Sequence, residues 1–134
     1  RYLLDTNAVI SALNTPGGPV SRRLHAIAPA DVGVSAIVMH ELYFGAFKSQ
    51  RREHNLALVD ALRFEVLQLD TEDARHAGEI RACLAAQGTP IGAYDILIAG
   101  QARARGLVLI TRNLREFERV QGLSTENWQD APST

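Results

Sequence analysis

The sequence is poor in cysteine and lysine, and it has no long hydrophobic run. Cys83 is the only cysteine, so the chain forms no internal disulfide and no zinc site built from several cysteines. No apolar stretch approaches the roughly 20 residues that a membrane-spanning helix needs. The sequence shows no basic segment followed by an apolar one, which is the pattern of an export signal. We therefore expect a cytoplasmic protein without a membrane segment, in which Cys83 is buried.

Histidine is also sparse, and its positions lack the spacing of metal ligands. We interpret the four histidines as surface or half-buried residues without a catalytic role: His25, His40, His54 and His76. None of them is an evident partner for Cys83, and no other nucleophilic side chain has a paired base. The sequence thus offers no pair of residues for nucleophilic catalysis.

Positive charge is present but unevenly distributed. The formal net charge is only −1, so the protein as a whole is not a general binder of phosphate backbones. Smaller basic groups occur at 22–23 and 48–52, and five arginines fall within seventeen residues: Arg103, Arg105, Arg112, Arg115 and Arg119. Any one group taken alone is more simply a solvated helix face. Together they could frame an acidic site that accepts a polyanion.

Length and hydrophobic pattern indicate one α/β domain. No repeat or linker divides the 134 residues, so we expect a single domain over 1–134. Short β-like runs occur at 3–4, 32–35, 66–69, 107–111 and 123–125. Apolar residues at helical spacing follow Asn7 and recur at 19–28, 37–48, 53–63, 71–87 and 93–105. This alternation predicts a three-layer α/β/α domain with a mostly parallel, five-stranded central sheet.

Three acidic residues are predicted to meet at one edge of this sheet. Asp5 directly follows the first strand, and Glu41 lies in the first turns of the helix after the second strand, where Gly45 leaves room beside it. Asp95 heads an otherwise apolar helix face, and the fourth strand ends at Thr111. The carboxyl ends of parallel strands share one edge, and ligands bind there in such sheets.

Each acid also has a purely structural explanation. Asp5 is equally suited to cap the helix after it, Glu41 to lie on a surface, and Asp95 to interact with the dipole of its own helix. Three separate explanations account poorly for three acids at one edge, and no arginine or lysine has an evident claim to neutralise them. A divalent cation is the simpler partner. Oxygen ligands without cysteine or histidine favour Mg²⁺ or Mn²⁺ over zinc.

Four segments give the chain a resemblance to a known family. They cover essentially the whole chain, and they read LLDTNAVI at 3–10, SAIVMHELYFGA at 35–46, PIGAYDILIAGQARARG at 90–106 and LITRNLREFERVQGLSTENW at 109–128. On these segments the chain resembles the PIN-domain ribonucleases, and in particular the VapC-type toxins of VapBC toxin–antitoxin systems. The resemblance implies a PIN-like fold and a Mg²⁺- or Mn²⁺-dependent endoribonuclease that cleaves structured RNA, often tRNA, to inhibit translation.

The resemblance also assigns roles to the acids. Asp5, Glu41 and Asp95 match the metal-binding and catalytic acids of the family. We expect Asp5 and Asp95 to bind the metal directly, and Glu41 to bind a second metal or to position the attacking water as a general base.

The supporting residues are less fixed. The family's fourth acid often lies two residues after the threonine that ends the fourth strand, and this chain has Asn113 there. Either Asn113 contributes a neutral oxygen or Glu116 reaches in instead, and the sequence leaves both alternatives open. Asn7 and Thr111 are candidates to orient the carboxylates.

The implied partners are a cognate VapB-type antitoxin and a second copy of the chain. The antitoxin is expected to place an arginine against the acids and an amphipathic segment in an apolar groove lined by Val9, Leu13, Leu42 and Phe47. DNA would be reached only through the antitoxin. One shallow acidic edge offers little grip on folded RNA, so we also expect a homodimer with two sites beside a shared basic groove.

Other functions remain as alternatives. A phosphotransferase of the haloacid dehalogenase type needs a second aspartate two positions after the first, where this chain has Asn7. A receiver-like phosphorylation module needs a late lysine, whereas Lys48 is the only lysine. A binding module whose acids contact a partner without catalysis is a third alternative. A fourth is a PIN-domain component of a DNA-bound repressor complex with weak or no nuclease activity.

Overall fold

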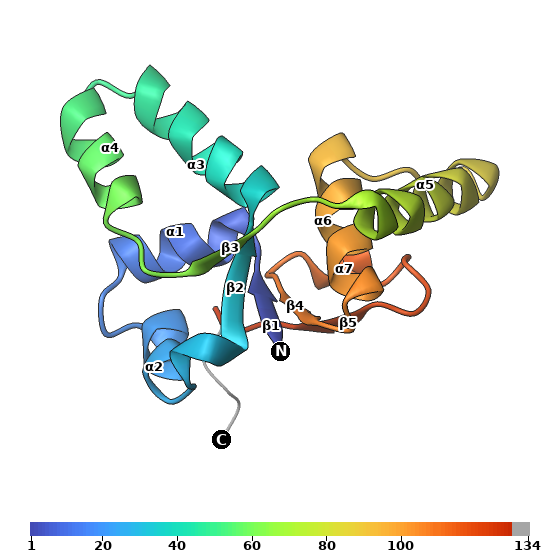
Figure 1. Cartoon of the computed structure of the whole chain (residues 1–134), viewed down its shortest axis with the longest axis horizontal. Helices are drawn as coiled ribbons and strands as arrows, with labels where there is room; N and C mark the ends of the chain where they lie inside the picture. Colours follow the sequence, from blue (N-terminus) through green and yellow to red (C-terminus); the bar gives the residue numbers. More distant parts are fainter. Residues whose placement is uncertain (130–134) are drawn as a thin grey trace.

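A five-stranded parallel sheet forms the centre of the molecule. The structure is a computed structural model that describes residues 1–129, and its strands are arranged in the order β3-β2-β1-β4-β5 (Figure 1). All four strand pairs are parallel. The strands are β1 Tyr2–Leu4, β2 Val32–Ser35, β3 Glu65–Leu67, β4 Val108–Ile110 and β5 Ser124–Glu126.

Helices cover both faces of the sheet. On one side lie α1 Thr6–Asn14, α2 Pro19–His25, α3 Ala36–Lys48 and α4 Arg52–Asp60 (Figure 1). On the other side lie α5 Thr71–Ala86, α6 Ala93–Ala104 and α7 Leu114–Phe117. Right-handed crossovers between parallel strands require this division, because the chain moves from β1 outward to β3 and then returns to β4 on the far side of β1.

The predicted three-layer α/β/α architecture is confirmed. Each predicted strand is present, with ends that differ by at most two residues, and the five predicted helices are present with ends that differ by up to three. The predicted third strand ends early, because the chain turns after Leu67 into a capping box in which Asp70 and Asp73 each accept from the other's backbone N–H. The single domain predicted over 1–134 includes residues 130–134, which lie outside the described residues.

The order in which the strands are added to the sheet reverses between β1 and β4, although the two strands are parallel. The two strands are neighbours, with Leu4 opposite Ile110, and the Asp5 N–H donates to the Ile110 carbonyl at 3.0 Å. From β1 the chain continues into α1 on one face, and from β4 it continues into α7 on the other. Parallel sheets open a crevice at such a point, outside the carboxyl ends of the strands. The fold therefore places Asp5 and Thr111 beside this crevice.

Helices α5 and α6 pack closely on each other. A Cβ added to Gly100 on α6 would lie 2.6 Å from the backbone nitrogen of Ala77 on α5, so only glycine fits at this contact. Ile98, Ala99 and Ala102, which were predicted to share a face with Asp95, are all buried. This contact fixes the helix that carries Asp95 against its neighbour.

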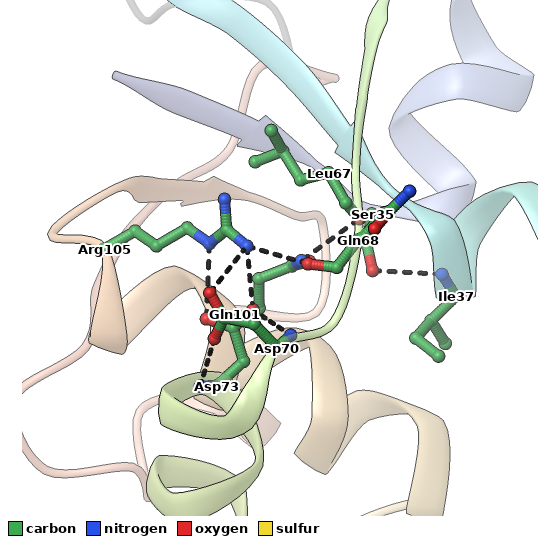
Figure 2. A network of polar contacts seen from close by, with 8 residues as sticks. All are labelled: Ser35, Ile37, Leu67, Gln68, Asp70, Asp73, Gln101 and Arg105. Atoms are coloured by element: carbon green, nitrogen blue, oxygen red, sulfur yellow. Dashed lines mark hydrogen bonds and ion pairs between the residues drawn. The ribbon is translucent and has the colours of Figure 1, made fainter.

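A polar network, drawn in Figure 2, holds α6 against α5 and β3. The Arg105 guanidinium donates to both carboxylate oxygens of Asp73, at 3.2 and 2.9 Å. The buried Gln101 amide donates to the carbonyls of Leu67 and Gln68, at 3.2 and 3.1 Å. These bonds satisfy backbone groups at the end of β3 that leave the sheet. We call Asp73, Gln101 and Arg105 the clamp.

The structure bears on the expectations for a membrane segment, for the four histidines and for Cys83. Within residues 1–129, no helix is long and apolar enough to cross a membrane. The four histidines are exposed or half-buried, as expected. The prediction that Cys83 is buried is wrong, because its side chain is exposed. The buried face of α5 is formed by Ala77, Ile80 and Leu84, and Cys83 lies to one side of it.

Candidate active site

Asp5 is buried at the carboxyl end of β1, with 7% of its surface exposed. Its Oδ1 accepts the Ala8 N–H at 2.8 Å, so the residue does cap α1. Burial raises the pKa of the Asp5 carboxyl, hydrogen bonds from Thr111 and Ala8 oppose this shift, and the charge of Glu41 adds to it. Asp5 can therefore both cap α1 and bind a ligand, because the cap uses one carboxylate oxygen and leaves the other available.

Thr111 orients Asp5 from the neighbouring strand. Its side chain is fully buried, and its Oγ1 accepts the Asn113 N–H at 3.0 Å. A hydrogen bond from the Thr111 side chain favours the charged form of Asp5 and so opposes the rise in its pKa. These contacts link the end of β4 to the end of β1, and the supporting role of Thr111 stays a prediction. Asn7, the other supporting candidate, is exposed in the first turn of α1.

Asp95 lies in the first turn of α6, beside the other acids. Burial, followed by the negative charges of Glu116, Glu41 and Asp5 and a hydrogen bond with Glu116, raises the pKa of Asp95 to about 6. Like charges raise a carboxyl pKa in this way only when they lie close by. Asp5, Glu41 and Glu116 therefore lie close enough to Asp95 for their charges to affect its ionisation.

Glu41 approaches the site from the opposite side, on α3. Its Oε1 accepts the Thr6 hydroxyl at 2.9 Å, and Thr6 directly follows Asp5. Ser35 begins α3 by accepting the Ile37 N–H at 3.0 Å, which fixes the start of the helix at the end of β2. Gly45 is exposed with open space beside its Cα, as expected from its spacing to Glu41. Sequence reasoning missed Thr6, although its position next to Asp5 was a signal.

The fourth acid at the site is Glu116, on the short helix α7. Its Oε1 accepts the Gly92 N–H at 3.2 Å, and its Oε2 accepts the side-chain amide of Asn113. Of the two candidates for the fourth position, Glu116 therefore brings the charge toward Asp95, and Asn113 holds Glu116 in place.

The four carboxylates suit a hard divalent cation in kind, but they do not yet converge on one point. All their donors are oxygens, and the ion pairs found within residues 1–129 join other acids to Arg23, Arg103 and Arg105. In the same part of the chain, no three acidic or histidine side chains lie close enough together to hold an ion. Glu41 and Glu116 are engaged in hydrogen bonds with Thr6, Asn113 and Gly92, so either acid would have to turn before it could bind an ion directly.

Four arginines of the cluster form two pairs with different roles. Arg103 pairs with Glu79 at 2.5 Å, and Arg105 belongs to the clamp, so both stabilise α5 against α6. Arg115 and Arg119 are exposed and line a cavity of about 420 Å³ together with Glu116 and Gly92. Of these four arginines, Arg115 and Arg119 are the pair that borders Glu116.

An apolar groove of about 200 Å³ runs beside Glu41, between α1, α3 and α4. Its apolar lining is Ile10, Leu13, Leu42, Ala46, Leu58 and Val59. Leu13 and Leu42 are among the residues predicted for the antitoxin groove. The prediction for Val9 is wrong, because Val9 is fully buried in the core. Phe47 is exposed but lies outside this groove.

Comparison with known proteins identifies relatives over nearly the full chain. Residues 2–123 match the PIN domain family. The chain is 44% identical to the tRNA(fMet)-specific endonuclease VapC of Shigella flexneri and 45% identical to that of Salmonella typhimurium. Both alignments span 130 residues and cover 96% of this chain and 98% of the relative.

Solved structures give the same result. The crystal structure of DNA-bound VapBC from Salmonella typhimurium matches with a TM-score of 0.91 at 45% identity, covering 96% of this chain and 98% of that one. VapBC2 from Rickettsia felis, bound to a promoter DNA fragment, matches with a TM-score of 0.87 at 32% identity, covering 95% and 98%. PIN-domain ribonucleases are in general dependent on a divalent metal ion. This chain belongs to the PIN-domain family and, within it, to the VapC ribonucleases.

Proposed function

We propose that the protein is a metal-dependent endoribonuclease and the toxin of a type II VapBC toxin–antitoxin pair. The observation that carries this proposal is the group of four carboxylates beside the crevice between β1 and β4, where burial and mutual repulsion raise the pKa of Asp95 to about 6. Such a group is costly unless a cation binds it. Its position matches the place where parallel sheets bind ligands.

Asp5 and Asp95 are the residues that hold the ion in this proposal. Asp5 uses Oδ1 to cap α1 and presents its second oxygen to the site, and the Thr111 hydroxyl fixes the plane of this carboxylate. When bound, the divalent ion polarises a phosphate oxygen and increases the acidity of the attacking water. Glu41 completes the ion site or accepts a proton from that water as a general base. Asn113 orients Glu116 as the fourth acid.

Mg²⁺ is the proposed ion, with Mn²⁺ as a substitute. Both ions accept carboxylate oxygens and water, and Mg²⁺ usually binds through one or two carboxylates while keeping several waters. Asp5 and Asp95 fit this requirement without further protein ligands. The remaining acids can then act through water, which agrees with their present hydrogen bonds to Thr6 and Gly92.

The proposed substrate is structured RNA, and specifically tRNA in the cytoplasm. The relatives from Shigella flexneri and Salmonella typhimurium are named for action on tRNA(fMet), and they share 44% and 45% of their aligned residues with this chain. Arg115 and Arg119 border the acids and offer positive charge to the phosphates that flank the cleaved bond.

We further propose that a VapB-type antitoxin inhibits the site through the groove beside Glu41. Ile10 and Leu58 are 38% and 42% exposed there, so an apolar helix face would remove them from water. An arginine that follows this helix would reach the carboxylates and replace the charge of the ion. Arg→Ala at that position of the antitoxin should restore cleavage far more than it weakens binding.

A homodimer is also proposed, with two acidic edges beside a shared basic surface. A second role of the complex is repression on DNA. It is supported by two matched structures, VapBC from Salmonella typhimurium and VapBC2 from Rickettsia felis, in which those complexes are bound to DNA. In this role the toxin would contact DNA only through the antitoxin.

The proposed homodimer is tested by measuring its mass by light scattering at micromolar concentration. A mass of one chain with full activity would contradict it.

The nuclease proposal is tested by mapping the 5′ ends of RNA from cells that express the protein. Asp5→Asn serves as the matched control, because it keeps the size of the side chain and can still cap α1 through its amide oxygen. We expect new 5′ ends in tRNA and arrested growth with the wild type, and neither with Asp5→Asn. New ends of equal abundance in both samples would contradict the assignment of the site.

A further inference from the structure

Two aromatic rings are in contact, one from each of the helices α3 and α6, which carry the proposed catalytic acids Glu41 and Asp95. His40 precedes Glu41 on α3, and Tyr94 precedes Asp95 on α6. Their ring centroids lie 5.1 Å apart with the planes at 60°, which is an edge-to-face contact. The contact joins two segments that are 54 positions apart in the sequence, one residue away from an acid on each side.

The ring of Tyr94 remains open to solvent despite this contact. It is 48% exposed, and His40 is also exposed. The other two tyrosines are engaged within the fold: Tyr2 packs on Trp128, and the Tyr43 hydroxyl donates to Asp60 at 2.5 Å. Within residues 1–129, the Tyr94 hydroxyl has no hydrogen bond that anchors it in the same way. Its surface is therefore available to a ligand.

We propose that Tyr94, held by His40, is a stacking site for a nucleobase of the RNA beside the phosphate that is cleaved. This inference rests on the proposed endoribonuclease function and adds a positioning element to it. Unpaired bases of RNA are commonly bound by exposed aromatic rings. The acids accept the phosphate through an ion but make no contact that would hold a base. The ring pair supplies that contact next to them.

The antitoxin is the competing occupant of this surface, and the geometry favours RNA. The apolar groove proposed for the antitoxin includes Leu42 and Ala46 on α3. His40 is two residues before Leu42, which places it about 200° around the helix. The ring pair and the groove therefore lie on different sides of α3, and His40 and Tyr94 do not line the groove.

Binding of short oligonucleotides to the full protein tests the stacking site directly. Anisotropy of a labelled oligoadenylate is compared with that of an abasic sugar–phosphate chain of equal length, in EDTA so that no cleavage occurs. The wild type should prefer the oligoadenylate by about tenfold, which is the range of one base stacked on an aromatic ring. Tyr94→Leu and His40→Ala should lose this preference, whereas Tyr94→Phe should keep it because the ring remains.

Phe47→Ala is the matched control on α3. Phe47 is 53% exposed, and its position seven residues after His40 places it about 10 Å further along the helix. It should retain the preference for bases. Equal loss in Phe47→Ala, full preference in Tyr94→Leu, or no preference in the wild type would each overturn the proposal.

Two further readouts separate this proposal from the others. If Tyr94→Leu keeps the base preference but weakens binding of the antitoxin, the rings belong to the antitoxin interface and the proposal is wrong. Cleavage of tRNA with Mg²⁺ is measured on the same samples. Cleavage without any base preference refutes only the stacking site, whereas base preference without cleavage refutes the nuclease function and leaves a nucleic-acid binding site.

Discussion

Asp73 and Asp95 lie in the first turns of adjacent helices, yet their pKa values are shifted in opposite directions. Asp73 has a side chain that is 1% exposed and receives two hydrogen bonds from Arg105. Burial alone would raise its pKa, but the bonds from Arg105 and Asp70 outweigh burial and lower it. Asp95 has acids as neighbours, and its pKa is raised to about 6.

The difference between the two carboxylates separates structure from function. Asp73 stabilises the fold, and its charge is balanced within the chain by the guanidinium of Arg105. At the edge of β1 and β4, four acids gather, and the ion pairs described within residues 1–129 involve none of them. Such clusters of perturbed carboxylates are typical of catalytic sites. The missing charge is expected to come from outside the chain.

The largest expected effect comes from neutralising the site. Asp95→Asn should reduce RNA cleavage by more than about a hundredfold, because even residues that only support a metal ligand cost 10–100-fold. Its thermal unfolding temperature without metal should stay equal or rise, since repulsion with Glu116, Glu41 and Asp5 is relieved. Cleavage assays and calorimetry on the same sample test both parts. Full activity, or unfolding at a much lower temperature, would contradict the assignment.

Neutralising the clamp should have the reverse outcome. Asp73→Asn removes the buried carboxylate of the pair and leaves Arg105 only its longer ion pair with Asp70, at 3.6 Å. It should cost about 2–3 kcal/mol, below the usual value for a buried pair because Arg105 is 31% exposed. The unfolding temperature should fall by several degrees. Cleavage per folded molecule should be unchanged. A specific loss of cleavage without loss of stability would show that the clamp is part of the active site.

The fourth position offers a finer comparison between an acid and the amide that holds it. Glu116→Gln removes a charge next to Asp95 and should weaken Mn²⁺ binding by about 10–100-fold. Asn113→Ala removes only the bond that orients Glu116, so its effect should be smaller. Asn113→Asp adds an acid at this position and should keep or raise affinity. If Glu116→Gln is silent and Asn113→Ala is inactive, the two roles must be exchanged.

The smallest expected effect is a pH dependence of stability without metal. Burial and neighbouring acids raise the pKa of Asp95 from 3.8 to about 6, so between these values the folded state keeps a proton that the unfolded state has lost. Stability should therefore fall by about 1–2 kcal/mol as the pH rises through this range, after allowance for solvent screening. Asp95→Asn should reduce this fall and leave the part that comes from Asp5, whose pKa is also raised by burial. Urea unfolding at pH 4, 5, 6 and 7 tests it.

Much of the site follows from the sequence because the acids lie at fixed positions relative to strand ends. Asp5 directly follows a short apolar run, and Asp95 heads an apolar helix face, so a parallel sheet brings them to one edge. The same logic located Thr111. Glu41 required the further assumption that its helix begins at the end of β2, which Ser35 ensures by capping α3.

The remaining features depend on contacts that no local pattern contains. Arg105 and Asp73 are 32 positions apart, and only the packing of α5 on α6 pairs them. Val9 and Leu13 are both apolar and share one side of α1, yet only Leu13 reaches the groove beside α3 and α4. Cys83 was predicted to be buried from its residue type alone, whereas its place beside the packed face of α5 leaves it exposed.

Binding of Mn²⁺ by the protein after treatment with EDTA is the most direct test of whether the acids at the ends of β1 and α6 form a metal site. Titration calorimetry is performed on the wild type, Asp5→Asn, Asp95→Asn and Asp73→Asn, and cleavage of tRNA is measured on the same samples. We expect the wild type and Asp73→Asn to bind the ion and cleave RNA, and both Asp5→Asn and Asp95→Asn to lose binding and cleavage together. Equal Mn²⁺ affinity in Asp5→Asn, Asp95→Asn and the wild type would contradict this expectation.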